Sequence, residues 1–221
     1  DYLEASEVPS RALLVVARSG FHYGEYAAVR GALEGAGIEV RIASSAEAIC
    51  MPQPNSGQPA DGGRIQAEVS FADVRIDDFG AIVLLGGWGA VAHQHAFPGV
   101  YRSAAFTGDP ASKAALNTIV AAALARDRLV AGIGFGVTAL AWARRDDGAS
   151  PLQGRSVPLI EGGSPAVTLD GRVYEWGALA NRTHVESNGG TVLAPGSIGY
   201  PRSAADDVLV DGRLVTAQDV R

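Results

Sequence analysis

Three short apolar runs, each followed at once by a glycine-rich turn, constrain the fold of this chain more than any other feature. The runs cover residues 11–17, 81–85 and 129–133, and the turns cover residues 19–24, 86–90 and 134–136. Short apolar runs with β-branched content are typical of strands that are covered on both faces. Such strands, alternating with helices, favour a parallel sheet.

Apolar residues at helical spacing predict the segments that connect these strands. Ala28, Val29, Ala32 and Leu33 lie on one face of a helix over residues 25–34. We expect further helices over residues 111–126 and 137–144, a strand over 38–42 and an edge strand over 65–71. From Pro151 onward the pattern predicts short strands with turns at Asp170-Gly171 and Asp211-Gly212. The prediction is one α/β domain with a mostly parallel sheet sandwiched by helices.

The charge balance and the lengths of the apolar stretches each exclude one class of partner. The chain carries 18 basic and 24 acidic residues, a formal net charge of −6, and no basic run, so we expect no nucleic-acid partner. No apolar stretch approaches the roughly 20 residues of a membrane-spanning helix, so we expect no membrane partner. Residues 1–4 lack the pattern of a signal peptide, and the single cysteine, Cys50, allows no internal disulfide. A reducing cytoplasm is the expected location.

The glycine-rich turns predict the position of a ligand site. In parallel sheets the crevice lies beyond the carboxyl ends of the strands, where glycine lets the main chain approach a ligand. The same turns hold four aromatic residues, Phe21, Tyr23, Trp88 and Phe135. Aromatic side chains that face this crevice would suit a flat or apolar metabolite. The alternative is that they pack at a dimer interface.

The order of these segments resembles the DJ-1/PfpI (ThiJ) superfamily. The resemblance rests on Gly24-Glu25 after the first strand and on residues 77–87, 131–136 and 210–216, and it spans nearly the whole chain. It implies a flavodoxin-like fold, a single domain over residues 1–221 and a homodimer. The family includes glyoxalase- and deglycase-like enzymes, peptidases, isonitrile hydratases and non-catalytic members.

One position departs from the family pattern. The resemblance implies a nucleophilic cysteine at position 134, where this chain has Gly134 followed by Phe135. Glycine has no side chain, so covalent thiol catalysis is excluded at this strand-to-helix turn, residues 134–136, which we call the elbow. Cys50 follows the second strand, in another part of the chain, and we expect it to be a buried or incidental thiol.

The acid of the family site is retained as Glu25. The resemblance places this carboxyl group beside the elbow, where it has the chemistry for general acid–base catalysis and where burial would favour its protonated form. A carboxylate that merely accompanies a helix N-terminus is the alternative. His22, three residues earlier, is the second catalytic candidate.

The glycine turns supply candidate binding groups. The resemblance puts the main-chain N–H groups of Gly87, Trp88 and Phe135 where an oxyanion develops. The missing side chain of Gly134 is expected to leave room for a substrate or a water molecule.

The remaining histidines and glycines support no cofactor. His93 and His95 are expected at a solvated helix start and His184 in a surface loop, so we predict no metal site. Residues 132–136 hold three alternating glycines, which is not the spacing of a dinucleotide-binding turn.

These residues favour a cofactor-independent enzyme. Glu25 would move protons while main-chain N–H groups hold an oxyanion, in lyase, hydratase or hydrolase chemistry on a carbonyl-bearing, hydrophobic or aromatic metabolite. The alternative is a non-catalytic protein of the same fold that binds a small molecule or a partner.

Overall fold

A seven-stranded sheet forms the centre of the protein. The structure is a computed structural model that describes residues 9–199 and 207–219. The strand order is β14-β15-β9-β7-β1-β3-β6, and every neighbouring pair is parallel except the β14–β15 hairpin. These strands are β1 (Arg11–Val15), β3 (Glu39–Ser44), β6 (Val69–Ser70), β7 (Ala81–Leu84), β9 (Leu129–Ile133), β14 (Val208–Asp211) and β15 (Leu214–Ala217). The predicted α/β class is confirmed.

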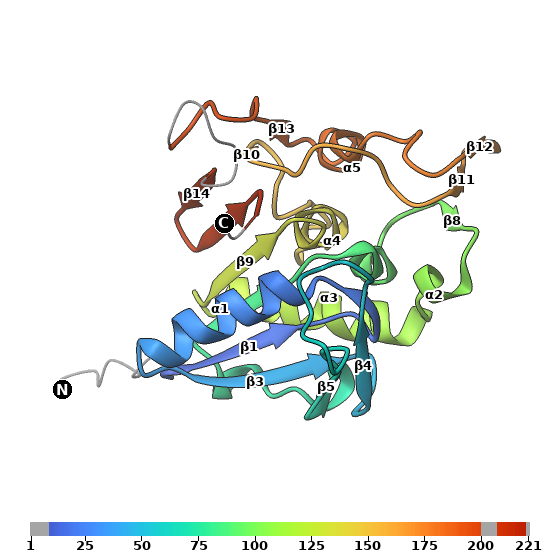
Figure 1. Cartoon of the computed structure of the whole chain (residues 1–221). Coiled ribbons are helices and arrows are strands. Elements are labelled where there is room, and N and C mark those ends of the chain that lie inside the picture. Colours follow the sequence, from blue (N-terminus) through green and yellow to red (C-terminus); the bar gives the residue numbers. More distant parts are fainter. Residues whose placement is uncertain (1–8, 200–206, 220–221) are drawn as a thin grey trace.

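Helices cover both faces of this sheet (Figure 1). Leu14 of β1 and Val16, just after β1, pack in one apolar cluster with Tyr26 of α1 (Tyr23–Gly35). Leu13 and Val15 pack on the opposite face with residues of α3 (Pro110–Ala125) and α4 (Gly136–Trp142). Because side chains alternate along a strand, one apolar run serves both layers.

Shorter elements surround the sheet at its carboxyl edge and beyond α4. The short strands are β2 (Ser19–Phe21), β4 (Ile49–Pro52), β5 (Ile65–Gln66), β8 (Val100–Tyr101), β10 (Ser156–Val157), β11 (Val167–Leu169), β12 (Arg172–Tyr174) and β13 (Thr191–Val192). The short helices are α2 (Ala104–Thr107), α5 (Asn181–Glu186) and the 3₁₀ helices η1 (Phe71–Asp73), η2 (Ile76–Asp78) and η3 (Trp88–His93). None of the helices in the described ranges is long and apolar enough to cross a bilayer.

Two expectations for the secondary structure need correction. The predicted edge strand over residues 65–71 is two short strands, because the chain leaves its antiparallel pairing with β4 and joins β3 in the main sheet. Ala67 is fully buried at the crossing. The segment after Pro151 contains α5 in addition to the expected short strands. The turn between β11 and β12 falls at Asp170-Gly171 as predicted.

Glycines allow the turns at the carboxyl edge to touch one another. A Cβ atom on Gly89 would lie 1.9 Å from the carbonyl oxygen of Ser19, and one on Gly136 would lie 2.0 Å from that of Leu84. No side chain fits at these distances. The close approach brings the ends of β1, β7 and β9 into one crowded region of backbone.

We expect alanine at Gly136 to destabilise the fold, because the added methyl group meets backbone that cannot move independently. The free energy of unfolding should fall by at least about 2 kcal/mol. Gly31 is the matched control, because it lies within α1 and a Cβ atom added there would meet nothing within 4 Å. Alanine there should stabilise the protein by about 0.5–1 kcal/mol. Urea unfolding measures both, and equal effects would contradict this account of Gly136.

Candidate active site

The structure brings Glu25 and the elbow together. Glu25 lies in the first turn of α1, and Gly134 lies between β9 and α4 with a φ of +52°. A Cβ atom on Gly134 would lie 2.7 Å from Oε1 of Glu25. The carboxyl group therefore faces the position where the resemblance implies a thiol.

The Glu25 carboxyl group is buried and accepts one backbone hydrogen bond. The residue is 3% exposed, and the N–H of Gly86 donates to Oε2 at 2.7 Å. Burial raises the pKa of Glu25 to about 8, the Gly86 hydrogen bond opposes this shift, and the charge of Asp219 adds to it. At neutral pH the carboxyl group is therefore mostly protonated and has a proton to donate.

The space beside Gly134 differs from the expectation. We expected room for a substrate or a water molecule where the thiol is missing, but Oε1 of Glu25 already lies against this position. The carboxyl group can lie there because glycine has no side chain at this position. Glu25 itself therefore occupies the space in which we expected a ligand.

Of the three predicted oxyanion donors, one is occupied. The N–H of Trp88 donates to the side-chain oxygen of Gln53 at 2.9 Å. The N–H groups of Gly87 and Phe135 have no acceptor among the residues that the structure describes. The Phe135 nitrogen would lie 2.8 Å from a Cβ atom on Gly86, close to Oε2 of Glu25. At least one N–H group without an acceptor in the described residues, that of Phe135, thus lies near the acid.

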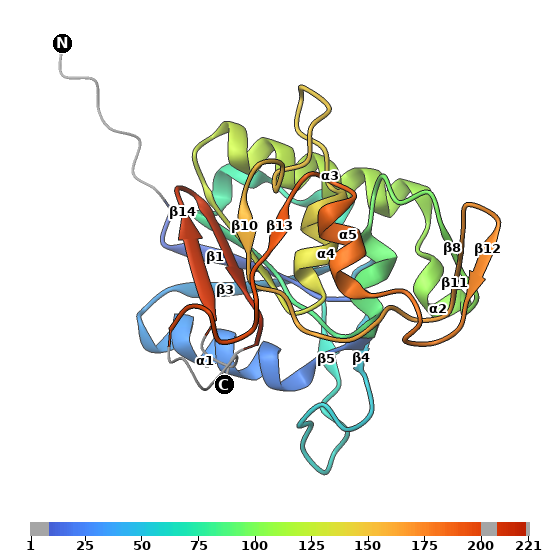
Figure 2. The same ribbon diagram turned by 90° about the horizontal axis from the view of Figure 1, so that it is seen from above.

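The loop between β4 and β5 covers the start of α1, a role that the sequence did not reveal. The buried Ser56 accepts the Tyr23 N–H through its hydroxyl at 3.1 Å and the Gly24 N–H through its carbonyl at 2.8 Å. Its hydroxyl donates to the carbonyl of Gln53 at 2.8 Å. Figure 2 shows this loop beside the N-terminal end of α1. The loop therefore accepts hydrogen bonds from N–H groups in the first turn of α1, which have no acceptor within the helix.

His22 caps the same helix. Its Nδ1 accepts the N–H of Glu25 at 3.2 Å and lies 3.9 Å from Oε1 of that residue. An accepting Nδ1 places the ring proton on Nε2. His22 therefore fixes the backbone of the acid and borders its carboxyl group.

A second carboxylate adjoins the elbow and was missed from the sequence. The carbonyl of Ala217, the last residue of β15, accepts the Gly134 N–H at 3.0 Å. Asp219 follows two residues later and raises the pKa of Glu25. A like charge near a buried acid favours the neutral form of that acid. The only signal in the sequence was a carboxylate just past a strand end.

The aromatic candidates divide into two groups. Trp88 packs against Phe135, with ring centroids 4.9 Å apart, and against Trp176, at 4.8 Å. Trp176 is 52% exposed and was not predicted. Phe21 is fully buried in the apolar cluster beneath α1, next to the half-buried Tyr23. Its predicted role as a ligand contact therefore has no support, while Trp88 and Phe135 stay beside the N–H donors.

Two histidine predictions were wrong. His184 is buried in α5, where its Nδ1 accepts the indole N–H of Trp142 at 3.0 Å and its Nε2 contacts the hydroxyl of Ser164. Because Nδ1 accepts, Nε2 carries the proton and donates to Ser164, so this pair is not a base with a nucleophile. His93 is also buried, in η3, whereas His95 is exposed as expected. Among residues 9–199 and 207–219, no three potential metal ligands cluster.

A buried network of hydrogen-bonded side chains ends on the backbone of the elbow. The Tyr101 hydroxyl donates to Gln94 at 2.6 Å, and the amide of Gln94 donates to Thr138 at 2.8 Å. The Thr138 hydroxyl then donates to the carbonyl of Phe135 at 2.9 Å. Fully satisfied buried networks of this kind fix geometry. The network fixes the peptide that follows Phe135.

Comparisons with solved structures identify the fold. A ThiJ/PfpI domain protein from Brachyspira murdochii has a TM-score of 0.64 at 19% identity, over 97% of this chain and 90% of that chain. Drosophila melanogaster DJ-1beta has a TM-score of 0.59 at 17% identity, over 96% and 83%. Glyoxalase III from Candida albicans has a TM-score of 0.66 at 13% identity, over 95% and 91%. No protein-family model and no curated sequence matches the chain. The expected DJ-1/PfpI-like fold is confirmed.

The raised pKa of Glu25 predicts how stability depends on pH. The folded pKa of about 8 lies above the ordinary value of 4.5, so the folded state binds more protons between these values. The contribution of Glu25 to the free energy of unfolding should therefore fall as pH rises through this window, by on the order of 3 kcal/mol. Glu25→Gln removes the titrating group, so the difference between variant and wild type isolates its contribution.

Urea unfolding at pH 5 and at pH 8.5 measures this difference. The pKa values of His93 and His184 are lowered from 6.5 to about 4, so these residues make the free energy of unfolding rise with pH between those values. They do so equally in both proteins, and the difference between wild type and Glu25→Gln removes their effect. Parallel pH profiles for the wild type and Glu25→Gln would show that Glu25 is not buried as a neutral acid.

Proposed function

We propose that this protein is a cofactor-independent enzyme that acts on a carbonyl-bearing, hydrophobic or aromatic metabolite, with Glu25 as general acid and base. The observation that carries the proposal is a buried, mostly neutral carboxyl group beside main-chain N–H groups that have no acceptor in the described residues. A proton donor next to oxyanion donors is the equipment of acid–base catalysis at a carbonyl group.

The proposed chemistry follows from the two kinds of donor. The N–H groups of Gly87 and Phe135 hold the substrate oxygen as negative charge develops on it, each contributing on the order of 3 kcal/mol. Glu25 gives its proton to the leaving group in an elimination or hydrolysis, or to a substrate carbon in a hydration. It then takes a proton from the carbon acid or from the attacking water, which returns it to its starting form. The same cycle serves a lyase, a hydratase or a hydrolase.

The fold supports an enzyme but not a thiol enzyme. A protein of similar fold is a glyoxalase III, so this architecture hosts catalysis. Position 134 is glycine, and the thiol of Cys50 is fully buried in β4 with its pKa raised by burial. Chemistry that needs a thiolate at the elbow is therefore not proposed. A homodimer in the cytoplasm remains part of the proposal.

A non-catalytic binding protein of the same fold is the second candidate. Two observations favour it. The side-chain oxygen of Gln53 already accepts the hydrogen bond of the Trp88 N–H, and the Glu25 side chain is almost fully buried. The two candidates differ in one respect: only the enzyme requires the Glu25 proton.

Glu25→Gln should reduce kcat by about 10²–10⁴-fold while ligand affinity changes little, because the amide keeps the shape but cannot exchange a proton. A panel of carbonyl metabolites is screened for turnover by NMR and for thermal stabilisation. Glu34→Gln is the matched control, since Glu34 lies on the same helix and pairs with Arg30 at 2.8 Å on the surface. Ligands that stabilise both proteins equally without any turnover would favour the second candidate.

A further inference from the structure

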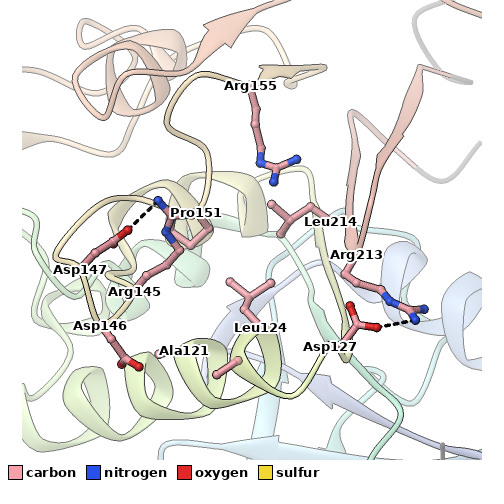
Figure 3. A pocket seen from close by; sticks show the side chains of 11 residues that line it. Ala121, Leu124, Asp127, Arg145, Asp146, Asp147, Pro151, Arg155, Arg213 and Leu214 are labelled. Atoms are coloured by element: carbon pink, nitrogen blue, oxygen red, sulfur yellow. Dashed lines mark hydrogen bonds and ion pairs between the residues drawn. The ribbon is translucent and has the colours of Figure 1, made fainter.

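Two of the larger cavities lie at opposite edges of the sheet and differ in charge pairing. One, of about 480 Å³, lies at the amino ends of β9 and β15 (Figure 3). Its three arginines are all in ion pairs: Arg213 with Asp127 at 2.7 Å, Arg145 with Asp147 at 3.1 Å, and Arg155 with Asp211. The other, of about 660 Å³, lies at the carboxyl ends of β1 and β3. In parallel sheets the carboxyl edge is where ligands bind.

The cavity at the carboxyl edge, which we call the β1–β3 cavity, contains a buried histidine without a hydrogen-bond partner. His93 lines it and is only 7% exposed. Its ring packs edge-on against Phe71, with centroids 5.2 Å apart, and no hydrogen bond joins either ring nitrogen to a described residue. Burial lowers the pKa of His93 to about 4, so the ring is neutral and has one donor and one acceptor to offer.

The β1–β3 cavity also contains an unpaired cation. Arg18 follows β1, is exposed and forms no ion pair with a described residue. The acidic group of the cavity, Asp109, is already engaged, because its carboxylate caps α3 by accepting the Ser112 N–H at 2.8 Å. Asp109 stays ionised, so the lining carries one charge of each sign, and Arg18 is the charged group that forms no ion pair with a described residue. A guanidinium group binds carboxylates through paired hydrogen bonds.

Apolar side chains lie on the same walls as these two groups. Ile49 and Met51 of β4 line the cavity and are 57% and 41% exposed. Alanines of α2 and η3 line it as well. A volume of this size is typical of sites for small molecules, which combine apolar walls with a few polar groups.

The β1–β3 cavity is separate from the candidate active site. Ser19 and Gly89 line it, and their backbones are in close contact. Glu25 and Gly134 do not line it. Nothing in the proposed chemistry of Glu25 uses Arg18 or His93.

We propose that the β1–β3 cavity binds a small organic carboxylate that carries a hydroxyl group away from its acid end. The exposed Arg18 binds the carboxylate at the rim, the walls of β4 and α2 contact the apolar body, and the buried His93 exchanges a hydrogen bond with the hydroxyl group. The buried His93 ring then gains a hydrogen-bond partner, and the Arg18 guanidinium group gains an ion pair.

The test uses 4-hydroxyphenylacetate as the probe, titrated into the full chain at pH 7 and followed by amide NMR shifts of η3 and β1. We expect saturable binding near these elements. Phenylacetate, which lacks the hydroxyl group, should bind about 5–10-fold more weakly. Tyramine, which replaces the carboxylate by an ammonium group, should not bind. Because these comparisons use the wild type, they do not depend on the folding of any variant.

Variants then assign the two ends of the ligand. Arg18→Gln should weaken binding about tenfold or more, whereas Arg64→Gln, an equal loss of charge at an exposed residue outside the cavity lining, should have no effect. His93→Leu should abolish the preference for the hydroxylated probe, and His93→Gln, which keeps a donor and an acceptor, should retain part of it.

Three results would overturn the proposal: no saturable shifts at about 10 mM probe, equal binding of tyramine, or equal effects of the Arg18 and Arg64 substitutions. Glu25→Gln is expected to leave probe binding unchanged. A failure at this cavity is therefore distinguishable from a failure of the proposed catalytic role.

Discussion

The contact between the turn after β7 and the elbow after β9 is the constraint on which the candidate site depends. A Cβ atom on Gly86 would lie within 2.8 Å of three groups: the Glu25 carboxyl oxygen, the Ile133 carbonyl oxygen and the Phe135 nitrogen. With glycine at this position, an acid, an acceptor and a donor converge from three segments of the chain. Any larger residue would separate the acid from the N–H that is proposed to work beside it.

The absence of a side chain at position 134 sets the surroundings of Glu25. With no side chain at Gly134, the carboxyl group lies against the elbow backbone and keeps one neutral partner, the Gly86 N–H. A single backbone donor does not offset the cost of burying a charge, so the group is held neutral. A neutral carboxyl group donates a proton where a carboxylate cannot. Burial makes Glu25 costly to ionise, and for the same reason the group stays protonated and can act as an acid.

The sequence was informative where local pattern and strand direction decide the outcome. The alternation of Leu13 and Leu14 was enough to predict apolar layers on both faces of the sheet. The glycines at the strand ends were enough to predict tight turns at its carboxyl edge. The proximity of Glu25 to Gly134 came from the resemblance. Gln53 and Asp219 were missed because their places are set by contacts between distant segments. His184 was misread because a polar residue in a turn-rich segment is usually exposed, and its partner, Trp142, lies 42 residues away.

The candidate active site and the β1–β3 cavity share two structural elements. Trp88 begins η3 beside the Glu25 site, and His93 ends η3 at the cavity. Met51 lines the cavity, and Gln53, two residues further on, holds the Trp88 N–H. Two short segments of the chain, residues 51–53 and 88–93, therefore connect the cavity lining to the hydrogen bond between Trp88 and Gln53. In this arrangement the cavity is adjacent to the proposed chemistry without containing any of its reacting groups, and the hydrogen bond from Trp88 to Gln53 is the point where the two meet.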